Sequence, residues 1–198
     1  MSRQVIKPYV SPEEYLALER QAENKHEYVD GEIWAWSGAC REHSLIAGNI
    51  LGELAQQLKG KPSEVYPGKM RVKAPVSRAY VYPDVVVVCD EPHFEDDYLD
   101  TLLNPTVVFE VLSKSTESYN RLAKSAYYRT IDSLSEYLLV AQEEYRIEQY
   151  VKQVAGRWLL TEVRSLDATI ELESIHCSLT LRDIYDRITI EPDAHPTE

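Results

Sequence analysis

The segments YPDVVVVCD at residues 82–90, PTVVFEVLSKS at 105–115 and NRLAKSAYY at 120–128 decide the fold of this chain. The first two are runs of β-branched residues, which predict strands buried on both faces. Each run contains one carboxylate, Asp84 in the first and Glu110 in the second. An unpaired charge in so apolar a strand is strongly disfavoured. Both carboxylates therefore require a cation, a metal ion or a hydrogen-bond network.

Composition predicts one folded unit of ordinary size. The chain has 198 residues, 44% of them hydrophobic, and no Gly-rich or Ser-rich linker. We expect a single domain over residues 1–190 and a flexible, polar tail over 191–198. No signal-peptide core and no membrane-length apolar run occur, which predicts a soluble, cytoplasmic protein with no membrane partner. The three cysteines include no Cys-x-x-Cys pair and favour neither disulfides nor zinc.

Net charge and charge distribution point in opposite directions. The formal charge of −12 argues against a polyanionic partner. However, Lys69, Arg71 and Lys73 alternate with apolar residues, so a strand there would place three cations on one face. Such a strip could follow a phosphate backbone, or it could be a solvated face whose charge prevents edge pairing.

The remaining patterns predict a mixed α/β (α+β) architecture, with a central sheet flanked by helices and additional hairpins. Ser11 and Glu14 form a capping-box pattern for a helix that ends near Arg20. Asp30-Gly31 predicts a two-residue hairpin turn. Helices are predicted over 42–58, 119–130 and 181–186, a loop over 90–100, and strands over 26–29, 32–36, 64–66, 69–74, 80–89, 106–113, 136–141, 145–151, 158–163 and 169–172.

Asp84 and Glu110 can act together if their strands are neighbours. Two converging carboxylates are the minimal protein contribution to an Mg²⁺ site, and they could also perform acid-base work without a metal. Lys124 lies four residues after Asn120 on the following helix, and a strand-to-helix return could bring it toward Glu110. A lysine there could stabilise charge on a phosphoryl group. Lys114 competes for this role, although it lies about 13 Å further along an extended strand.

The motifs resemble the Uma-type restriction endonuclease family, within the PD-(D/E)XK nuclease superfamily. The similarity rests on SPEEY, HEYVDGEI, YPDVVVV, EVLS, the helical lysine followed by tyrosine, and SEYLLV, in this order over about residues 8–150. A histidine near the start of the second predicted helix, His43, also fits this pattern.

The resemblance implies a restriction-endonuclease-like fold and a catalytic centre. Asp84 and Glu110 would hold Mg²⁺ or Mn²⁺, with the carbonyl of Val111 as a further ligand. Lys124 would be a displaced catalytic lysine, and Glu27 would assist the metal site.

Three positions depart from the family pattern. Leu112 stands where the superfamily has lysine, which shifts that role to Lys124. Asn120 and Ala141 stand where the Uma-type pattern tends to have aspartate. The lost carboxylates leave open a slow or inactive homologue.

The expected function is Mg²⁺- or Mn²⁺-dependent hydrolysis of a DNA phosphodiester. Lys69, Arg71 and Lys73 would contact phosphates. His43 is either a capping or packing side chain or an ancillary phosphate or water contact. The alternative is a non-catalytic binding or dimerisation module, because fourteen tyrosines suit an interface as well as a core. In either case we expect a homodimer.

Overall fold

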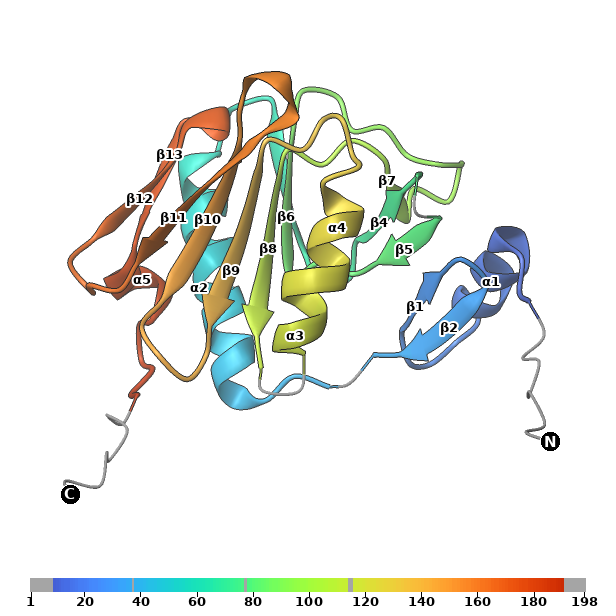
Figure 1. Cartoon of the computed structure of the whole chain (residues 1–198), viewed down its shortest axis with the longest axis horizontal. Coiled ribbons are helices and arrows are strands. Elements are labelled where there is room, and N and C mark those ends of the chain that lie inside the picture. Colours follow the sequence, from blue (N-terminus) through green and yellow to red (C-terminus); the bar gives the residue numbers. More distant parts are fainter. Residues whose placement is uncertain (1–8, 37, 77, 114–115, 191–198) are drawn as a thin grey trace.

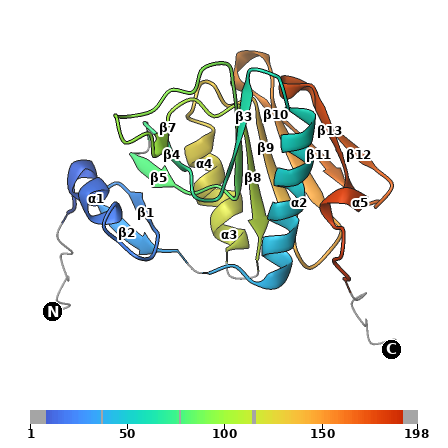
Figure 2. The same ribbon diagram turned by 180° about the vertical axis from the view of Figure 1, so that it is seen from behind.

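The computed structural model describes residues 9–36, 38–76, 78–113 and 116–190. They form two larger sheets, helices on both faces of one of them, and a small two-stranded sheet (Figures 1 and 2). The predicted mixed α+β class is confirmed. The tail over residues 191–198 lies outside the described part of the chain.

The six-stranded sheet has the order β11-β10-β9-β8-β6-β3. Its strands are β3 (Ser63–Pro67), β6 (Val85–Cys89), β8 (Val107–Leu112), β9 (Glu136–Ala141), β10 (Ile147–Lys152) and β11 (Trp158–Val163). At its centre β8 runs antiparallel to β6 and parallel to β9. These three strands are buried on both faces, as their predominantly apolar sequences predict.

Successive residues of the central strands enter two different cores. Val85 and Val87 pack with Ile46 and Ile50 of α2 (Arg41–Gln57). Val86, in contrast, belongs to a second cluster that includes residues of the helical segment after β8. Figure 1 shows these two layers on opposite faces of the sheet. The period of two along a strand thus fixes which side chains face which helix.

The sequence predicts one regular helix over 119–130, but the segment after β8 is divided into three pieces. It consists of α3 (Glu117–Tyr119), a π-helical stretch η1 (Asn120–Lys124) and α4 (Ser125–Tyr128). A π-turn adds a residue to each helical turn and rotates the side chains that follow it; such insertions are frequent at functional sites.

The five-stranded sheet has the order β2-β1-β5-β4-β7. Its strands are β1 (His26–Val29), β2 (Glu32–Ala35), β4 (Arg71–Ala74), β5 (Ala79–Val81) and β7 (Thr101–Leu102). The hairpin register predicted from Asp30-Gly31 is confirmed, with Val29 opposite Glu32. The capping box of α1 (Pro12–Glu19) is also present.

The single strand predicted over 80–89 is wrong. The chain leaves one sheet after β5 and enters the other at β6, and Tyr82, Pro83 and Asp84 form the connection. Proline has no N–H for a strand ladder, which favours a break at this position. Asp84 consequently stands at the beginning of a buried strand rather than in its middle.

The C-terminal part adds the hairpin β12 (Thr169–Leu172) and β13 (Cys177–Thr180), followed by α5 (Leu181–Ile184). Short 3₁₀ turns, η2 (Val154–Gly156) and η3 (Glu173–Ile175), connect strands in this region. β13 and β7 were not predicted from the sequence. No helix in the described ranges is long and apolar enough to cross a membrane.

Candidate active site

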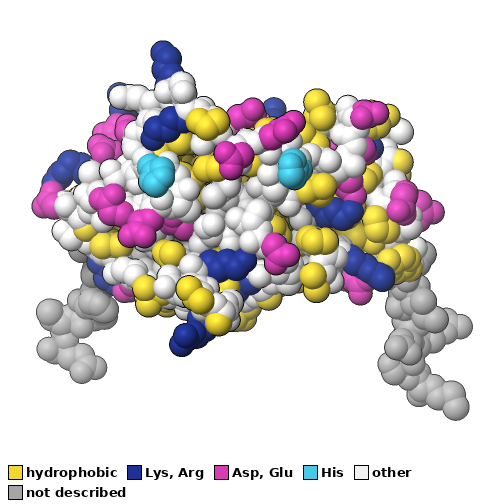
Figure 3. Space-filling view, turned by 90° about the horizontal axis from the view of Figure 1, so that it is seen from above, with side chains coloured by type: hydrophobic (Ala, Val, Ile, Leu, Met, Phe, Trp, Pro, Cys, Tyr) yellow, Lys and Arg dark blue, Asp and Glu magenta, His cyan; other side chains and the backbone are white. Residues whose placement is uncertain are grey.

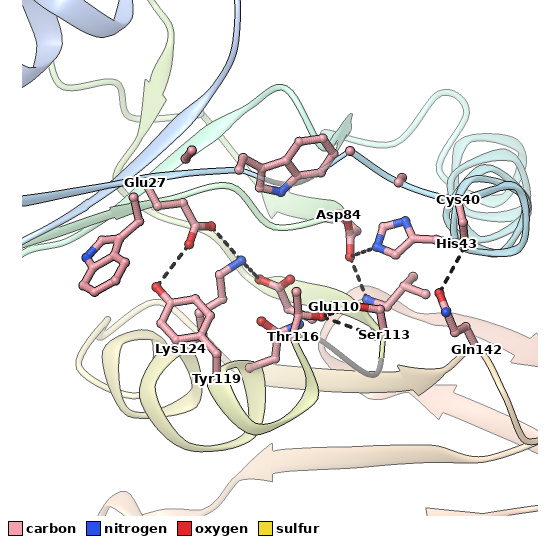
Figure 4. A pocket seen from close by; sticks show the side chains of 17 residues that line it. Glu27, Cys40, His43, Asp84, Glu110, Ser113, Thr116, Tyr119, Lys124 and Gln142 are labelled. Atoms are coloured by element: carbon pink, nitrogen blue, oxygen red, sulfur yellow. Dashed lines mark hydrogen bonds and ion pairs between the residues drawn. The ribbon is translucent and has the colours of Figure 1, made fainter.

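Four predicted site residues from four elements meet where the two larger sheets adjoin. Glu27 comes from β1, Asp84 from the connection before β6, Glu110 from β8 and Lys124 from the end of η1 (Figure 4). Their exposed fractions are 5%, 9%, 2% and 4%. The convergence of Asp84 and Glu110 follows from the pairing of β6 with β8, because the Asp84 amide donates to the Phe109 carbonyl at 3.1 Å.

Lys124 bridges two of the carboxylates. Its Nζ lies 2.7 Å from Glu27 Oε1 and 3.0 Å from Glu110 Oε1, and it donates to the Tyr82 carbonyl at 3.3 Å. Burial lowers the pKa of Lys124, but the neighbouring carboxylates Glu110 and Glu27 outweigh burial and raise it well above its ordinary value. Lys124 is therefore an ammonium at neutral pH.

Glu110 is the most deeply buried carboxylate of the group. Its Oε1 also accepts a hydrogen bond from the Tyr128 hydroxyl at 2.7 Å. Burial raises the pKa of Glu110 to about 8; Lys124 opposes this shift, and the nearby carboxylates of Asp84 and Glu27 add to it. Burial is thus the main cause of the raised pKa, and the nearby carboxylates add negative charge that one lysine does not neutralise.

Asp84 is oriented by the backbone of the neighbouring strand. Its Oδ2 accepts a hydrogen bond from the Val111 amide at 2.7 Å, and His43 Nε2 lies 3.3 Å from the same oxygen. Burial lowers the pKa of His43, but the contact with Asp84 reverses the shift and raises it overall. Both interpretations of His43, a capping or packing side chain and an ancillary phosphate or water contact, stay open, because the contact with Asp84 tests neither.

Glu27 is held by three donors. In addition to Lys124, the Tyr82 amide donates to Oε1 and the Tyr119 hydroxyl to Oε2, both at 3.1 Å. A carboxylate fixed in this way holds the ammonium of Lys124 in one position.

These side chains border a cavity of about 520 Å³, within the ~300–1,000 Å³ range of small-ligand sites. A second hollow of about 530 Å³ adjoins it and shares Trp36, His43 and Asp84 with it. The residues that line the first cavity are Glu27, Trp34, Ala35, Trp36, Gly38, Ala39, Cys40, His43, Asp84, Glu110, Val111, Ser113, Thr116, Tyr119, Asn120, Lys124 and Gln142.

The predicted strip of three exposed cations is wrong. Arg71 is buried, donates to the hydroxyls of Thr101 and Tyr82, and lies 2.8 Å from Asp100 Oδ1. Lys73 is ion-paired with Glu95. The predicted loop over 90–100 thus supplies the carboxylates, Glu95 and Asp100, that neutralise two of the three cations. Only Lys69, in the turn before β4, is exposed.

The three departures from the family pattern are all buried. Leu112 packs in the apolar cluster beneath α4, and the ammonium near Glu110 comes instead from η1. Asn120 is 3% exposed and lines the cavity, while Ala141 ends β9. Lys114, the competing lysine, lies outside the described residues.

Sequence reasoning missed Tyr119, Tyr128, Trp34 and Trp36. Tyr128 follows Lys124 by four residues, so helical spacing could have placed it beside the lysine. The Asp30-Gly31 turn implies the register that places Trp34 opposite Glu27. No signal in the sequence marks Tyr119.

The donor set fits a hard divalent cation. Asp84 and Glu110 offer carboxylate oxygens, and Mg²⁺ commonly uses one or two carboxylates plus water. Three carboxylates around one lysine leave negative charge that a cation would balance. Within the described ranges, no group of three or more His, Cys, Asp or Glu side chains is arranged to hold a metal by itself.

Comparisons with known proteins identify the family of this chain. A family model described as "Uma2: Putative restriction endonuclease" matches residues 12–183. Two uncharacterised proteins of Synechocystis are similar: sll1609 is 39% identical over 80% of this chain and 89% of its own length, and slr1290 is 35% identical over 90% and 92%.

A crystal structure from Anabaena variabilis, described as a putative nuclease, superposes with a TM-score of 0.72 at 16% identity. The match covers 91% of this chain and 99% of that chain. The fold is restriction-endonuclease-like, and the chain belongs to the Uma2 family of putative restriction endonucleases.

Proposed function

We propose that this protein is a metal-dependent endonuclease that hydrolyses DNA phosphodiester bonds. The observation that carries the proposal is a buried ammonium, Lys124, held between Glu27 and Glu110. Asp84 lines the same cavity. The description of the Uma2 family supports the same reaction class.

Asp84 and Glu110 would hold Mg²⁺ or Mn²⁺, and the Val111 carbonyl is a third candidate ligand. When bound, the cation would supply Lewis-acid polarisation of the phosphodiester. The Val111 amide already orients the Asp84 carboxylate, so this side chain would not have to become ordered when a metal binds.

Lys124 would stabilise the negative charge that develops on the phosphoryl oxygens. Because its pKa is raised, it acts as a hydrogen-bond donor and a fixed positive charge, not as a general base. Glu27 is a positioning residue in this scheme, since it contacts Lys124 and is itself held by Tyr82 and Tyr119.

Of the three cations expected to contact phosphates, Lys69 keeps that role in the proposal. It is exposed and lines the hollow that adjoins Asp84. His43 lines the same hollow and remains a candidate for an ancillary phosphate contact. The homodimer stays a prediction, which the solution mass of the purified protein would test.

Cleavage of supercoiled plasmid with Mg²⁺ or Mn²⁺ tests the proposal. We expect nicking by the wild type and loss of nicking in Asp84→Ala and Lys124→Ala. Asp167→Ala and Lys59→Ala are matched controls that change exposed side chains of the same charge. Equal activity in all variants would refute the assigned site. A folded wild type that neither cleaves DNA nor binds Mn²⁺ would favour the non-catalytic binding module.

A further inference from the structure

Two tryptophans lie beside the acidic site. Trp34 of β2 stands directly opposite Glu27 of β1 in the antiparallel register, so both side chains lie on the same face of the hairpin. Because Glu27 faces Lys124, Trp34 faces the cavity too, and it is 53% exposed. Trp36 follows at the exit of the hairpin and lines both hollows. Figure 4 draws both indoles among the lining side chains.

The second hollow adds positive charge to this aromatic wall. Lys25 and Lys69 line it, and neither makes an ion pair with a carboxylate among the described residues. Lys25 Nζ donates to the Gly68 carbonyl and lies 5.4 Å from the centre of the Trp36 ring. Burial lowers the pKa of Lys25, and Lys69 adds to this shift. Because both lysines line the same hollow, a phosphate bound there could contact both.

The depth of the site argues against a rigid duplex as its ligand. Glu110 is 2% exposed and Lys124 is 4% exposed, at the bottom of a cavity of about 520 Å³. An unpaired nucleotide can enter a cavity of this size more freely than a nucleotide held by pairing and stacking in a double helix. A net charge of −12 also disfavours a long double helix, whose binding usually requires a basic face. On the face in Figure 3, Lys and Arg side chains lie scattered among Asp and Glu.

We propose that the site takes an unpaired nucleic-acid strand, whose bases stack on Trp34 and Trp36 while Lys25 and Lys69 contact its phosphates. Cationic grooves with aromatic stacking surfaces are the general solution for binding single strands. Asp84 and His43 lie where the two hollows join, so a strand that passes from one hollow to the other carries one phosphate past the carboxylates. This inference rests on the proposed function, which makes the ligand a nucleic acid, and it restricts that ligand to single strands or locally unpaired duplex.

Binding in EDTA tests this inference separately from cleavage. The probe is a short fluorescein-labelled oligothymidylate, compared with a blunt duplex of the same length, by fluorescence anisotropy at low salt. We expect tighter binding of the single strand. We also expect a loss of about 5- to 100-fold in its affinity for Trp34→Ala, and for Trp34→Leu because leucine cannot stack, but near-wild-type affinity for Trp34→Phe.

Trp158→Phe is the matched control, since Trp158 is the remaining tryptophan and lies on β11 rather than in the cavity lining. Circular dichroism of each variant checks folding.

Equal affinity for duplex and single strand, or unchanged affinity in Trp34→Ala, would overturn the inference. Plasmid nicking that survives in Trp34→Ala would overturn it while the nuclease stands. Single-strand binding that depends on Trp34, in a protein that never cleaves, would keep the inference and refute the nuclease.

Discussion

Glu110 is the residue whose charge we expect to reduce the stability of the metal-free protein most. Burial raises its pKa from the ordinary 4.5 to about 8. Because the folded-state pKa lies above the unfolded value, the contribution of this carboxyl is fully present below pH 4.5 and is lost as the pH rises through 8. With these two values, the carboxyl at pH 7 is ionised in the unfolded state and mostly protonated in the folded state, and this proton uptake disfavours folding by about 3 kcal/mol.

The substitution Glu110→Gln should therefore stabilise the metal-free protein while it abolishes cleavage. The amide oxygen of glutamine can still accept from Tyr128, and Lys124 keeps Glu27 as its partner at 2.7 Å. The lost ion pair with Lys124 offsets part of the gain, which leaves about 1–3 kcal/mol at pH 8. At pH 5, close to the ordinary pKa of 4.5, the unfolded state also binds part of a proton at this carboxyl, so most of the gain should disappear.

Urea unfolding in EDTA at pH 5 and pH 8, followed by tryptophan fluorescence, measures this effect. Glu148→Gln is the matched control, because Glu148 is 4% exposed but paired with both Arg121 and Arg146. Removal of that charge leaves the buried Arg146 and the half-buried Arg121 with fewer partners and should cost about 3 kcal/mol. If Glu110→Gln destabilised the protein at both pH values as Glu148→Gln does, the excess of negative charge at the site would be refuted.

Three further predictions follow from the charged groups. Lys124→Ala should lose about 3–5 kcal/mol of stability in EDTA, because Glu27 and Glu110 would share the site without a cation; urea unfolding measures this, and no loss would contradict the bridging role. Lys69→Ala should reduce the slope of log affinity against log salt by about 0.7 for single-stranded DNA, with an unchanged slope as the contrary result. Asp100→Asn should reduce stability at pH 7 by about 1 kcal/mol or more, because Asp100 contacts both Arg20 and Arg71. Burial raises the pKa of Asp100, but these arginines outweigh burial and hold it well below the ordinary 3.8. The difference in unfolding free energy between Asp100→Asn and the wild type should therefore shrink as the pH falls below 3.8. A constant difference from pH 7 to pH 3 would contradict the pairing.

Local patterns in the sequence predicted much of the fold. The β-branched runs around Val85 and Val107 specify buried strands because both of their faces must avoid water. The Asp30-Gly31 turn fixes the register of β1 and β2 through its backbone geometry. Asp84 and Glu110 were recognisable because charge within an apolar strand requires a special environment.

Other features depend on contacts between distant segments. Residue preferences do not predict the change of sheets at Tyr82–Asp84 or the π-helical turn at Asn120–Lys124. Both depend on the strands and side chains that the folded chain places beside these segments. The sequence makes Arg71 a plausible phosphate contact, and only the fold brings Asp100 from a loop about thirty residues away to neutralise it.

The sequence by itself determined the buried strands, the hairpin register and the two carboxylates of the site, since these depend on neighbours within a few residues along the chain. Only the tertiary structure decided that Lys124 joins Glu27 to Glu110, that Lys69 is exposed while Arg71 is buried, and that Trp34 borders the site. Electrostatic and packing interactions act across space at a few ångströms, so their partners are known only when the chain has folded.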